Sequence, residues 1–218
     1  MNVRIVVFAK APVPGRAKTR LIPALGPEGA ARLQAALLED ALQRARAAGP
    51  AGLELWGTGD DPQGCLPAAA ARHGASLRDQ CDGDLGARMQ HALACATADG
   101  TPALVIGTDA PGLTPARIEQ AGESLARHDA VLVPALDGGY VLLGAHAAPA
   151  ELFTGIDWGT DRVLAATHAR LRTLGWRVDE RPVVWDVDEP EDLERVRALG
   201  GHWPAYLDGY QGAEPAAD

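Results

Sequence analysis

A loop rich in cations lies between residues 10 and 20 and has the composition of a phosphate-binding site. Lys10 and Lys18 are the only two lysines of the chain, and Arg16 and Arg20 stand beside them. Four cations and the backbone N–H groups of a loop with Pro and Gly, at a turn from a strand into a helix, suit a di- or triphosphate. The loop is not a Walker A motif, which needs Gly-Lys-Ser/Thr at the start of the helix. A solvated basic surface loop is the alternative.

Two groups of carboxylates follow other apolar segments and could bind a divalent cation. Asp109 comes shortly after the apolar residues 103–107, and five acids fall between Asp186 and Asp192. Mg²⁺ and Mn²⁺ take one or two protein carboxylates and leave the rest of their coordination sphere to water and phosphate. Asp109 with either Asp186 or Asp188 is therefore a candidate metal site. The alternatives are an Asp bonded to its own turn, and acids that favour the first turn of a helix.

Other polar segments have mainly structural interpretations. Residues 137–140 (DGGY) predict a hairpin turn, with close approach of a substrate to the backbone as the alternative. Asp84 belongs to a D-x-D string, but we expect it to cap a helix. The three cysteines are widely spaced, as in reduced thiols rather than a disulfide framework or a zinc site. The six histidines lack metal-ligand spacing and a G-x-S-x-G partner, which argues against a triad hydrolase.

Hydrophobic patterning places these motifs on alternating strands and helices. We expect strands over residues 3–9, 53–58, 76–78, 103–107, 130–134, 140–144 and 177–185, and helices, with their caps, over residues 27–48, 67–73, 84–98, 114–127, 160–175 and 190–199. This order predicts one α/β domain over residues 1–200, with a mostly parallel sheet and helices on both faces. In such a sheet ligands bind at the C-terminal ends of the strands, where the basic loop and both acidic groups lie. Residues 201–218 are expected to form a partly disordered tail that exposes Trp203, Tyr206 and Tyr210.

Composition narrows the class of protein. The chain of 218 residues has a formal charge of −9, which argues against nucleic-acid binding and against a polybasic membrane surface. It contains no apolar run of about 18 residues, and its first residues lack the pattern of a signal peptide. We therefore expect a cytoplasmic protein whose partners are small molecules, and the oligomeric state stays open.

Six strings, in this order, resemble the bacterial DUF2064 family of GT-A-fold transferases. They are residues 8–21 (FAKAPVPGRAKTRL), 83–89 (GDLGARM), 107–114 (GTDAPGLT), 137–140 (DGGY), 156–160 (IDWGT) and 186–193 (DVDEPEDL). The first string is long and specific, and together they span almost the whole chain up to residue 200. The family is similar to a wider nucleotide-diphospho-sugar transferase group that includes the 2-phospho-lactate guanylyltransferases and sugar-acid cytidylyltransferases.

The resemblance implies a GT-A-like fold and a role for each string. Nucleotide phosphates would be held by Ala9, Lys10, Gly15, Arg16, Lys18 and Arg20, and the base would lie near Gly83, Gly86 and Arg88. Asp109 and Asp188 would bind Mg²⁺ or Mn²⁺, and the acceptor would enter near Gly138, Gly139, Tyr140 and Trp158. Lys18 and Arg16 would assist the leaving group, with Asp137 as the general base. Two residues depart from the family pattern: Glu189 stands where Thr is usual, and Gly159 where Ser is usual.

Three functions fit these residues. The first, which we expect, is metal-dependent transfer of a sugar from a nucleotide-activated donor to a small acceptor. The second is nucleotidylyl transfer from an NTP to a small phosphorylated acceptor, with pyrophosphate as the leaving group. The third is a nucleotide-binding partner or regulator without catalysis. Release of pyrophosphate or of nucleoside diphosphate separates the first two.

Overall fold

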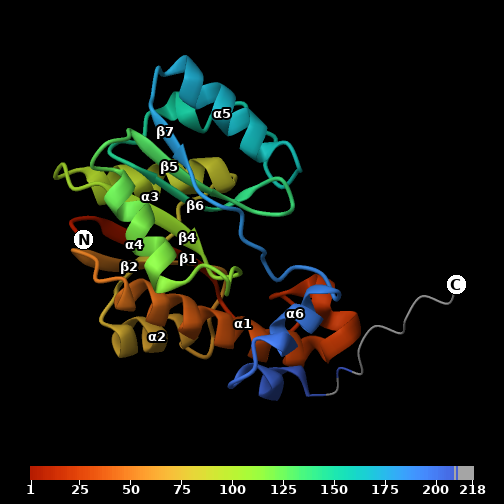
Figure 1. Ribbon diagram of the computed structural model, residues 1–218. Helices are drawn as coiled ribbons and strands as arrows, with labels where there is room; N and C mark the ends of the chain where they lie inside the picture. Colours follow the sequence, from red (N-terminus) through yellow and green to blue (C-terminus); the bar gives the residue numbers. More distant parts are fainter. Residues whose placement is uncertain (209, 211–218) are drawn as a thin grey trace, which may run out of the picture.

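A seven-stranded sheet with the order β3-β2-β1-β4-β6-β5-β7 forms the centre of the computed structural model, which describes residues 1–208 and 210 (Figure 1). The strands are β1 (Arg4–Lys10), β2 (Gly52–Thr58), β3 (Ser76–Asp79), β4 (Ala103–Gly107), β5 (Ala130–Pro134), β6 (Tyr140–Ala145) and β7 (Val178–Glu180). The helices are α1 (Ile22–Ala47), α2 (Cys65–His73), α3 (Leu85–Thr97), α4 (Pro115–Ser124), α5 (Val163–Thr173) and α6 (Asp192–Ala198), with 3-10 turns at Thr19–Leu21, Ala150–Leu152 and Trp203–Leu207. Strand β6 is antiparallel to β4 and β5, and the other neighbouring strands are parallel. The predicted mostly parallel α/β sheet is therefore confirmed.

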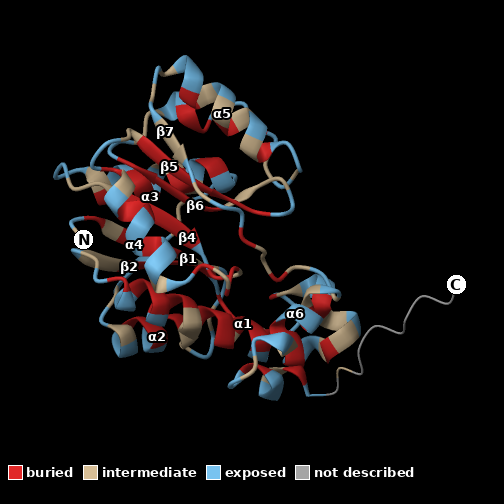
Figure 2. Cartoon of the chain, in the orientation of Figure 1, coloured by how far each residue is buried: buried red, intermediate tan, exposed pale blue. Residues whose placement is uncertain are grey.

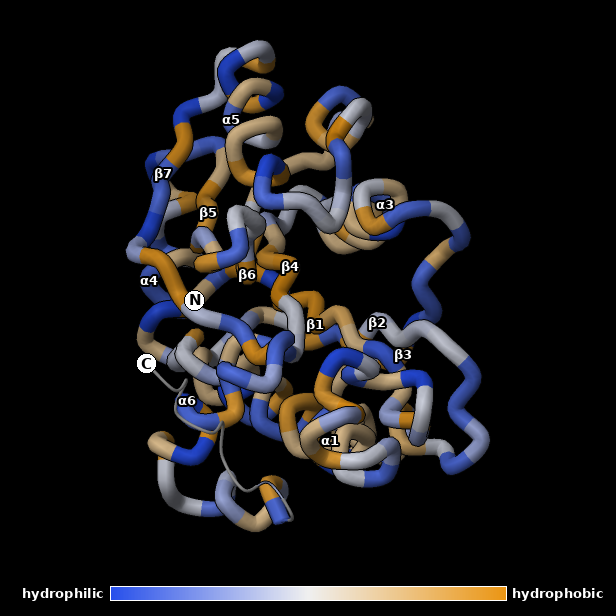
Figure 3. Tube along the Cα trace, turned by 90° about the vertical axis from the view of Figure 1, so that its right-hand side faces the viewer, coloured by the Kyte–Doolittle hydropathy of each residue, from blue (hydrophilic) through white to orange (hydrophobic). Residues whose placement is uncertain are grey.

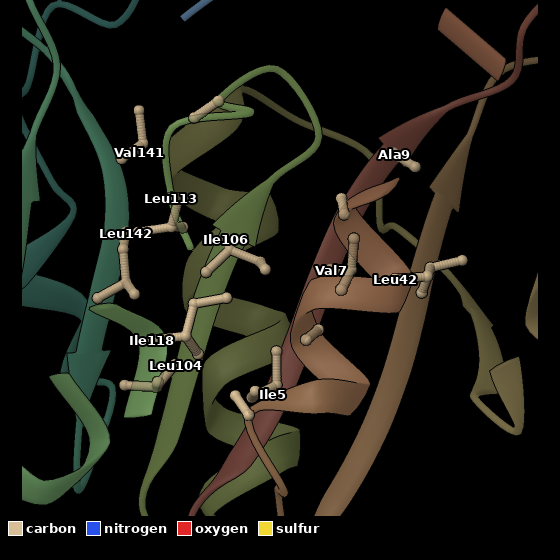
Figure 4. Packing of buried hydrophobic residues seen from close by; sticks show 14 of the residues in the cluster. Ile5, Val7, Ala9, Leu42, Leu104, Ile106, Leu113, Ile118, Val141 and Leu142 are labelled. Atoms are coloured by element: carbon tan, nitrogen blue, oxygen red, sulfur yellow. The ribbon is translucent and has the colours of Figure 1, made fainter. Parts of the chain in front are cut away.

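Successive residues of β1 pack into two cores on opposite faces of the sheet, because side chains alternate along a strand. Ile5 and Val7 join a cluster that includes Leu42 of α1 (Figure 4). Val6 belongs to the second cluster, with Leu93 of α3. Helices α1, α2 and α4 contribute to the first cluster, and α3 and α5 to the second. Figure 2 shows the resulting pattern, with buried strands between helices that are exposed on their outer sides.

A third hydrophobic cluster joins the start of α1 to the C-terminal segment. Leu21, Leu33, Val187, Val196 and Trp203 are all buried in it. Trp203 is only 6% exposed, so our expectation that it would be exposed is wrong: its ring packs within the chain against this cluster. The cluster therefore holds the segment after Lys18 next to the segment that carries Asp188.

Two element boundaries differ from the sequence expectation for identifiable reasons. Helix α1 begins at Ile22 instead of residue 27, and the backbone bends at Gly26, where φ is 68°, just before Pro27. Strand β7 ends at Glu180, five residues early. Beyond it, Pro182 lacks an N–H for strand pairing. The chain contacts β5 again where the Val184 N–H donates to the Pro134 oxygen, next to a bridge between Ala135 and Val184.

Two of the three predicted N-cap residues are confirmed. The Asp84 side chain accepts a hydrogen bond from the Ala87 N–H at the start of α3, and Thr114 caps α4 in the same way. Thr160 instead lies two residues before the α5 cap residue Arg162.

The three cysteines are free. Within the described residues, no helix has both the length and the apolar character needed to cross a membrane, and residues 211–218 of the expected disordered tail lie outside the described part.

Candidate active site

A cleft of about 550 Å³ opens at the C-terminal ends of the central strands. The cleft is lined by residues 8–10 at the end of β1, residues 107–110 at and after the end of β4, Thr58 at the end of β2 and Gln80 just beyond β3. Figure 3 shows the hydrophobic strands β1 and β4 in the middle of the molecule, with hydrophilic segments around them. The cleft thus forms at the edge of the sheet where α/β proteins bind ligands.

Lys18 connects the basic loop with two of the acids. Its side chain is 6% exposed, and Nζ lies 2.9 Å from Asp109 Oδ1 and 3.0 Å from Asp188 Oδ1. Nζ also donates a hydrogen bond to the Val187 carbonyl oxygen. Burial alone would lower the pKa of Lys18, but the two carboxylates raise it above its ordinary value. Lys18 is therefore a buried ammonium ion held between the two predicted metal ligands.

The other cations of the loop reach the same cleft. Lys10, Arg16 and Arg20 line it, as does the predicted Ala9, whereas Gly15 forms a turn with φ 77° and is not among its lining residues. Arg16 pairs with Asp60 at 2.5 Å, and Arg20 pairs with Glu189 at 3.0 Å. The Glu that departs from the family pattern is thus a partner of the basic loop. Both arginines are mostly exposed, so these pairs can open at little cost.

Three carboxylates gather at the cleft, and two of them, Asp186 and Asp188, line it. Asp137, Asp186 and Asp188 each place an oxygen within 4.8 Å of the others. Burial, and the charges of Asp137 and Asp188, raise the pKa of Asp186 to about 6. Asp137 lies at the tip of the predicted β5–β6 hairpin, where its Oδ1 accepts a hydrogen bond from the Gly139 N–H at 2.8 Å. The structure therefore brings Asp186, which the sequence left as an alternative, into the same cluster as Asp188.

Two consecutive hydrogen bonds from buried polar side chains end at Asp109, and they were not predicted from the sequence. Gln34 of α1, 4% exposed, donates from Nε2 to Thr108 Oγ1 at 3.3 Å, and Thr108 Oγ1 donates to Asp109 Oδ1 at 2.9 Å. The available signal was a polar residue at an inward position of a helix whose inward positions are otherwise apolar except for Arg44. A polar group at such a position needs a partner.

A second cavity of about 150 Å³ adjoins the cleft. Asp137, Gly139, Tyr140 and Trp158 line it, and Tyr140 and Asp186 belong to the walls of both cavities. The Tyr140 hydroxyl is buried, and burial raises its pKa. The other atoms of Tyr140 therefore form its part of the two cavity walls. Gly138 is not among the lining residues: its φ is 87°, and any side chain would overlap the backbone of Asp161. Of the four predicted acceptor residues, Gly139, Tyr140 and Trp158 therefore line the smaller cavity, and Gly138 forms the hairpin turn.

The start of α3 links the two cavities. Arg88 lines the cleft, and its Nε donates to the Gly83 carbonyl oxygen at 3.0 Å. Gly83 and Gly86 do not line the cleft. A Cβ on Gly86 would lie 2.6 Å from Cε2 of Trp158, so only glycine lets the indole pack there. Residues predicted for the nucleotide and for the acceptor are therefore in direct contact.

Comparisons with known proteins agree with this fold. The model of a family described as an uncharacterized protein conserved in bacteria, DUF2064, matches residues 32–160, more than half of the chain. A proposed nucleotide-diphospho-sugar transferase from Desulfovibrio desulfuricans G20 is 29% identical, with a TM-score of 0.83 over 96% of this chain and 98% of that one. A search of curated proteins gave no match.

Two more distant structures share the fold alone. A CMP:2-keto-3-deoxy-manno-octonic acid synthetase complexed with CTP is 16% identical, with a TM-score of 0.57 over 91% of this chain and 98% of that one. The Mycobacterium tuberculosis H37Rv protein Rv0371c in complex with manganese is 20% identical, with a TM-score of 0.54 over 86% and 92%. The fold is thus that of nucleotide-diphospho-sugar transferases.

Proposed function

This chain belongs to the DUF2064 family, and from that premise we propose that it is a divalent-metal-dependent transferase that moves a sugar from a nucleotide-activated donor to a small acceptor. One observation carries the proposal. A single cleft holds the cations of residues 10–20 on one side and the carboxylates of Asp109, Asp186 and Asp188 on the other. A diphosphate needs the first group, and the metal ion that accompanies it needs the second.

The basic loop supplies the phosphate-binding half of the site. Arg16 and Arg20 are 63% and 66% exposed and are paired with carboxylates, which phosphate oxygens can replace. Ala9 and Lys10 lie at the end of β1 and line the same cleft. As the bond to the sugar breaks, these cations would stabilise the negative charge that develops on the nucleoside diphosphate.

The acids of the cleft suit Mg²⁺ or Mn²⁺. Carboxylate oxygens are hard ligands of the kind these ions bind, and those of Asp137, Asp186 and Asp188 lie within 4.8 Å of one another. Burial, and then the neighbouring negative charges of Asp137 and Asp188, raise the pKa of Asp186, and a bound cation would offset those charges. Asp188 would hold the ion, with Asp109 as the predicted partner and Asp186 and Asp137 adjacent. The ion would supply Lewis-acid stabilisation of the phosphates.

The smaller cavity supports the assignment of the acceptor side. It adjoins the cleft, and Trp158 and Tyr140 give it an aromatic wall next to Asp137. The Tyr140 and Trp158 rings meet edge to face with centroids 6.5 Å apart. The Asp137 carboxylate is exposed at the hairpin tip, where it can accept a proton from an acceptor hydroxyl. Asp137 is therefore the proposed general base.

A ligand screen followed by a turnover assay tests this function. We expect one nucleotide sugar to raise the melting temperature in the presence of Mg²⁺ or Mn²⁺ but not of EDTA, because a ligand of the native state stabilises it by mass action. Asp109→Asn should then abolish most of the turnover with saturating metal. Unchanged turnover in that variant would overturn the assignment of Asp109 to the metal, and no shift with any nucleotide would overturn the phosphate site.

Nucleotidylyl transfer from an NTP is the second candidate. It is favoured by the likeness in fold to a synthetase complexed with CTP and by the four cations of one loop, which suit a triphosphate. The same cleft would serve attack at the α-phosphorus, with pyrophosphate leaving. Product analysis decides between the two: release of nucleoside diphosphate supports sugar transfer, and release of pyrophosphate supports nucleotidylyl transfer.

A further inference from the structure

Lys18 holds an unusual position for a phosphate-binding lysine. Its ammonium group contacts both Asp109 and Asp188, at 2.9 and 3.0 Å, and a third bond goes to the Val187 carbonyl oxygen. All three donor positions of an ammonium group are thus directed at the acidic side of the cleft. Lys18 is the cation that bridges the two carboxylates.

The backbone conformation of Lys18 and the packing of its segment fix the position of this side chain. Lys18 has φ 45° and ψ 48°, and it is the only residue other than glycine with a positive φ in the described part of the chain. Such a conformation persists where the surroundings enforce it. Leu21 and Val187, on the two segments that meet here, are fully buried in one hydrophobic cluster. The fold therefore fixes the backbone of Lys18, and a change of partners needs only a rotation of its side chain.

We infer that Lys18 is an internal cation that competes with the divalent metal ion for Asp109 and Asp188 and leaves them when nucleotide phosphates are bound. The inference rests on the proposed function. A lysine ammonium is a compact charge on a flexible stem, so it can turn from carboxylate to phosphate oxygens without movement of the backbone. An ammonium and a divalent ion repel each other strongly when both lie about 3 Å from the same oxygen in a partly buried site.

The consequence is coupled binding of metal and nucleotide. Without nucleotide, Lys18 lowers the apparent affinity of the carboxylates for the metal. Phosphates that attract Lys18 remove this competition, so nucleotide and metal each strengthen the binding of the other by the same factor. The alternative is that Lys18 keeps its place while the metal binds only to Asp137, Asp186 and Asp188. In that arrangement Lys18 does not move.

Lysine NMR of the intact protein distinguishes these arrangements. The chain has only two lysines, so lysine labelled with ¹³C and ¹⁵N gives two sets of side-chain signals, which Lys10→Arg assigns. We expect Mg²⁺ alone to shift the Cε and Nζ signals of Lys18 in a saturable titration. A Lys18 signal that stays unchanged at Mg²⁺ saturation overturns the inference.

Mn²⁺ titrations of variants provide the second test. Lys18→Met should bind Mn²⁺ at least tenfold more tightly than the wild type without nucleotide, and Lys18→Gln should do the same if the methionine variant does not fold. Arg32→Met removes an exposed cation of α1 that does not line the cleft, so its Mn²⁺ affinity should match the wild type. Equal affinity in the wild type and the Lys18 variants overturns this inference alone. No Mn²⁺ binding by any form overturns it together with the proposed metal site.

Discussion

Arg44 of α1 donates a hydrogen bond of 2.6 Å from Nη1 to the main-chain oxygen of Ala110, in the loop that follows β4. The same nitrogen reaches the Leu113 oxygen at 2.8 Å, and Nε lies 2.7 Å from Asp40 Oδ2. The Arg44 side chain is 11% exposed. The last turn of α1 therefore fixes both sides of the turn that begins at Asp109, from a position that does not line the cleft.

We expect Arg44→Lys to weaken metal binding through this turn. Lysine keeps a positive charge near Asp40 but lacks the fork that spans Asp40 and two carbonyl oxygens. A buried carbonyl that loses its donor costs about 1–3 kcal/mol, so the free energy of unfolding measured in urea should fall by that amount. The Mn²⁺ affinity should fall as well.

Arg46→Lys is the matched control for that change. Arg46 is exposed two residues further along α1, and it donates to the His73 carbonyl oxygen, away from the cleft. Its replacement should alter the free energy of unfolding by less than about 0.5 kcal/mol. If Arg44→Lys lost stability but kept its Mn²⁺ affinity, Arg44 would support the fold without positioning Asp109.

Arg16→Gln should separate ligand binding from stability. The Arg16 and Asp60 side chains are 63% and 81% exposed, so their ion pair contributes little to folding. A hydrogen bond to a charged phosphate is worth about 1.5–3 kcal/mol, and its loss should weaken nucleotide binding by about tenfold or more. Calorimetric titration with the nucleotide from the ligand screen, beside a thermal melt, measures both quantities.

Asp60→Asn removes the other half of the same pair and serves as its control. Without the Asp60 charge, Arg16 has no competing carboxylate, so nucleotide affinity should stay equal or increase. A loss of affinity in Asp60→Asn as large as that in Arg16→Gln would show that the pair acts as a structural unit instead of a phosphate site.

The Asp129 carboxylate ties β5 to the start of β7, and its effect on stability should depend on pH. The Arg177 side chain and backbone N–H hold the pKa of Asp129 below its usual value. A carboxyl whose pKa is lower in the folded state stabilises the protein above its unfolded-state pKa of about 4, and the contribution disappears as pH falls through the folded-state pKa. Asp129→Asn should therefore lower the melting temperature at pH 7 but not near pH 2. A difference independent of pH would contradict this.

Local signals in the sequence account for what could be predicted. Apolar and β-branched runs mark β1 and β4, and the capping side chains of Asp84 and Thr114 mark the starts of α3 and α4. Because parallel strands place their C-terminal ends together, the basic loop and the acidic segments could be assigned to one edge of the sheet from the sequence.

Side-chain partners that are distant in sequence could not be predicted. Lys18 and Asp188 are 170 residues apart, and their contact depends on how two loops pack through the third hydrophobic cluster. The choice between Asp186 and Asp188 also stayed open in the sequence, because both lie in one short segment and only the fold determines which neighbours each oxygen meets. Propensity and periodicity describe elements, whereas these contacts arise from loop geometry.

A double-mutant cycle on Gly86 and Trp158 should detect the link between the two cavities. Gly86→Ala would place a Cβ 2.6 Å from Trp158 Cε2, and overpacking of this kind costs about 1–3 kcal/mol of unfolding free energy. In Trp158→Ala the indole is gone, so alanine at position 86 should be neutral or stabilising, since it favours the helix over glycine. Urea unfolding of the four forms should therefore give an interaction energy of about 1 kcal/mol or more. Additive effects within about 0.5 kcal/mol would show that the indole does not resist a side chain at position 86, and the proposed nucleotide and acceptor sites would then not be coupled through this contact.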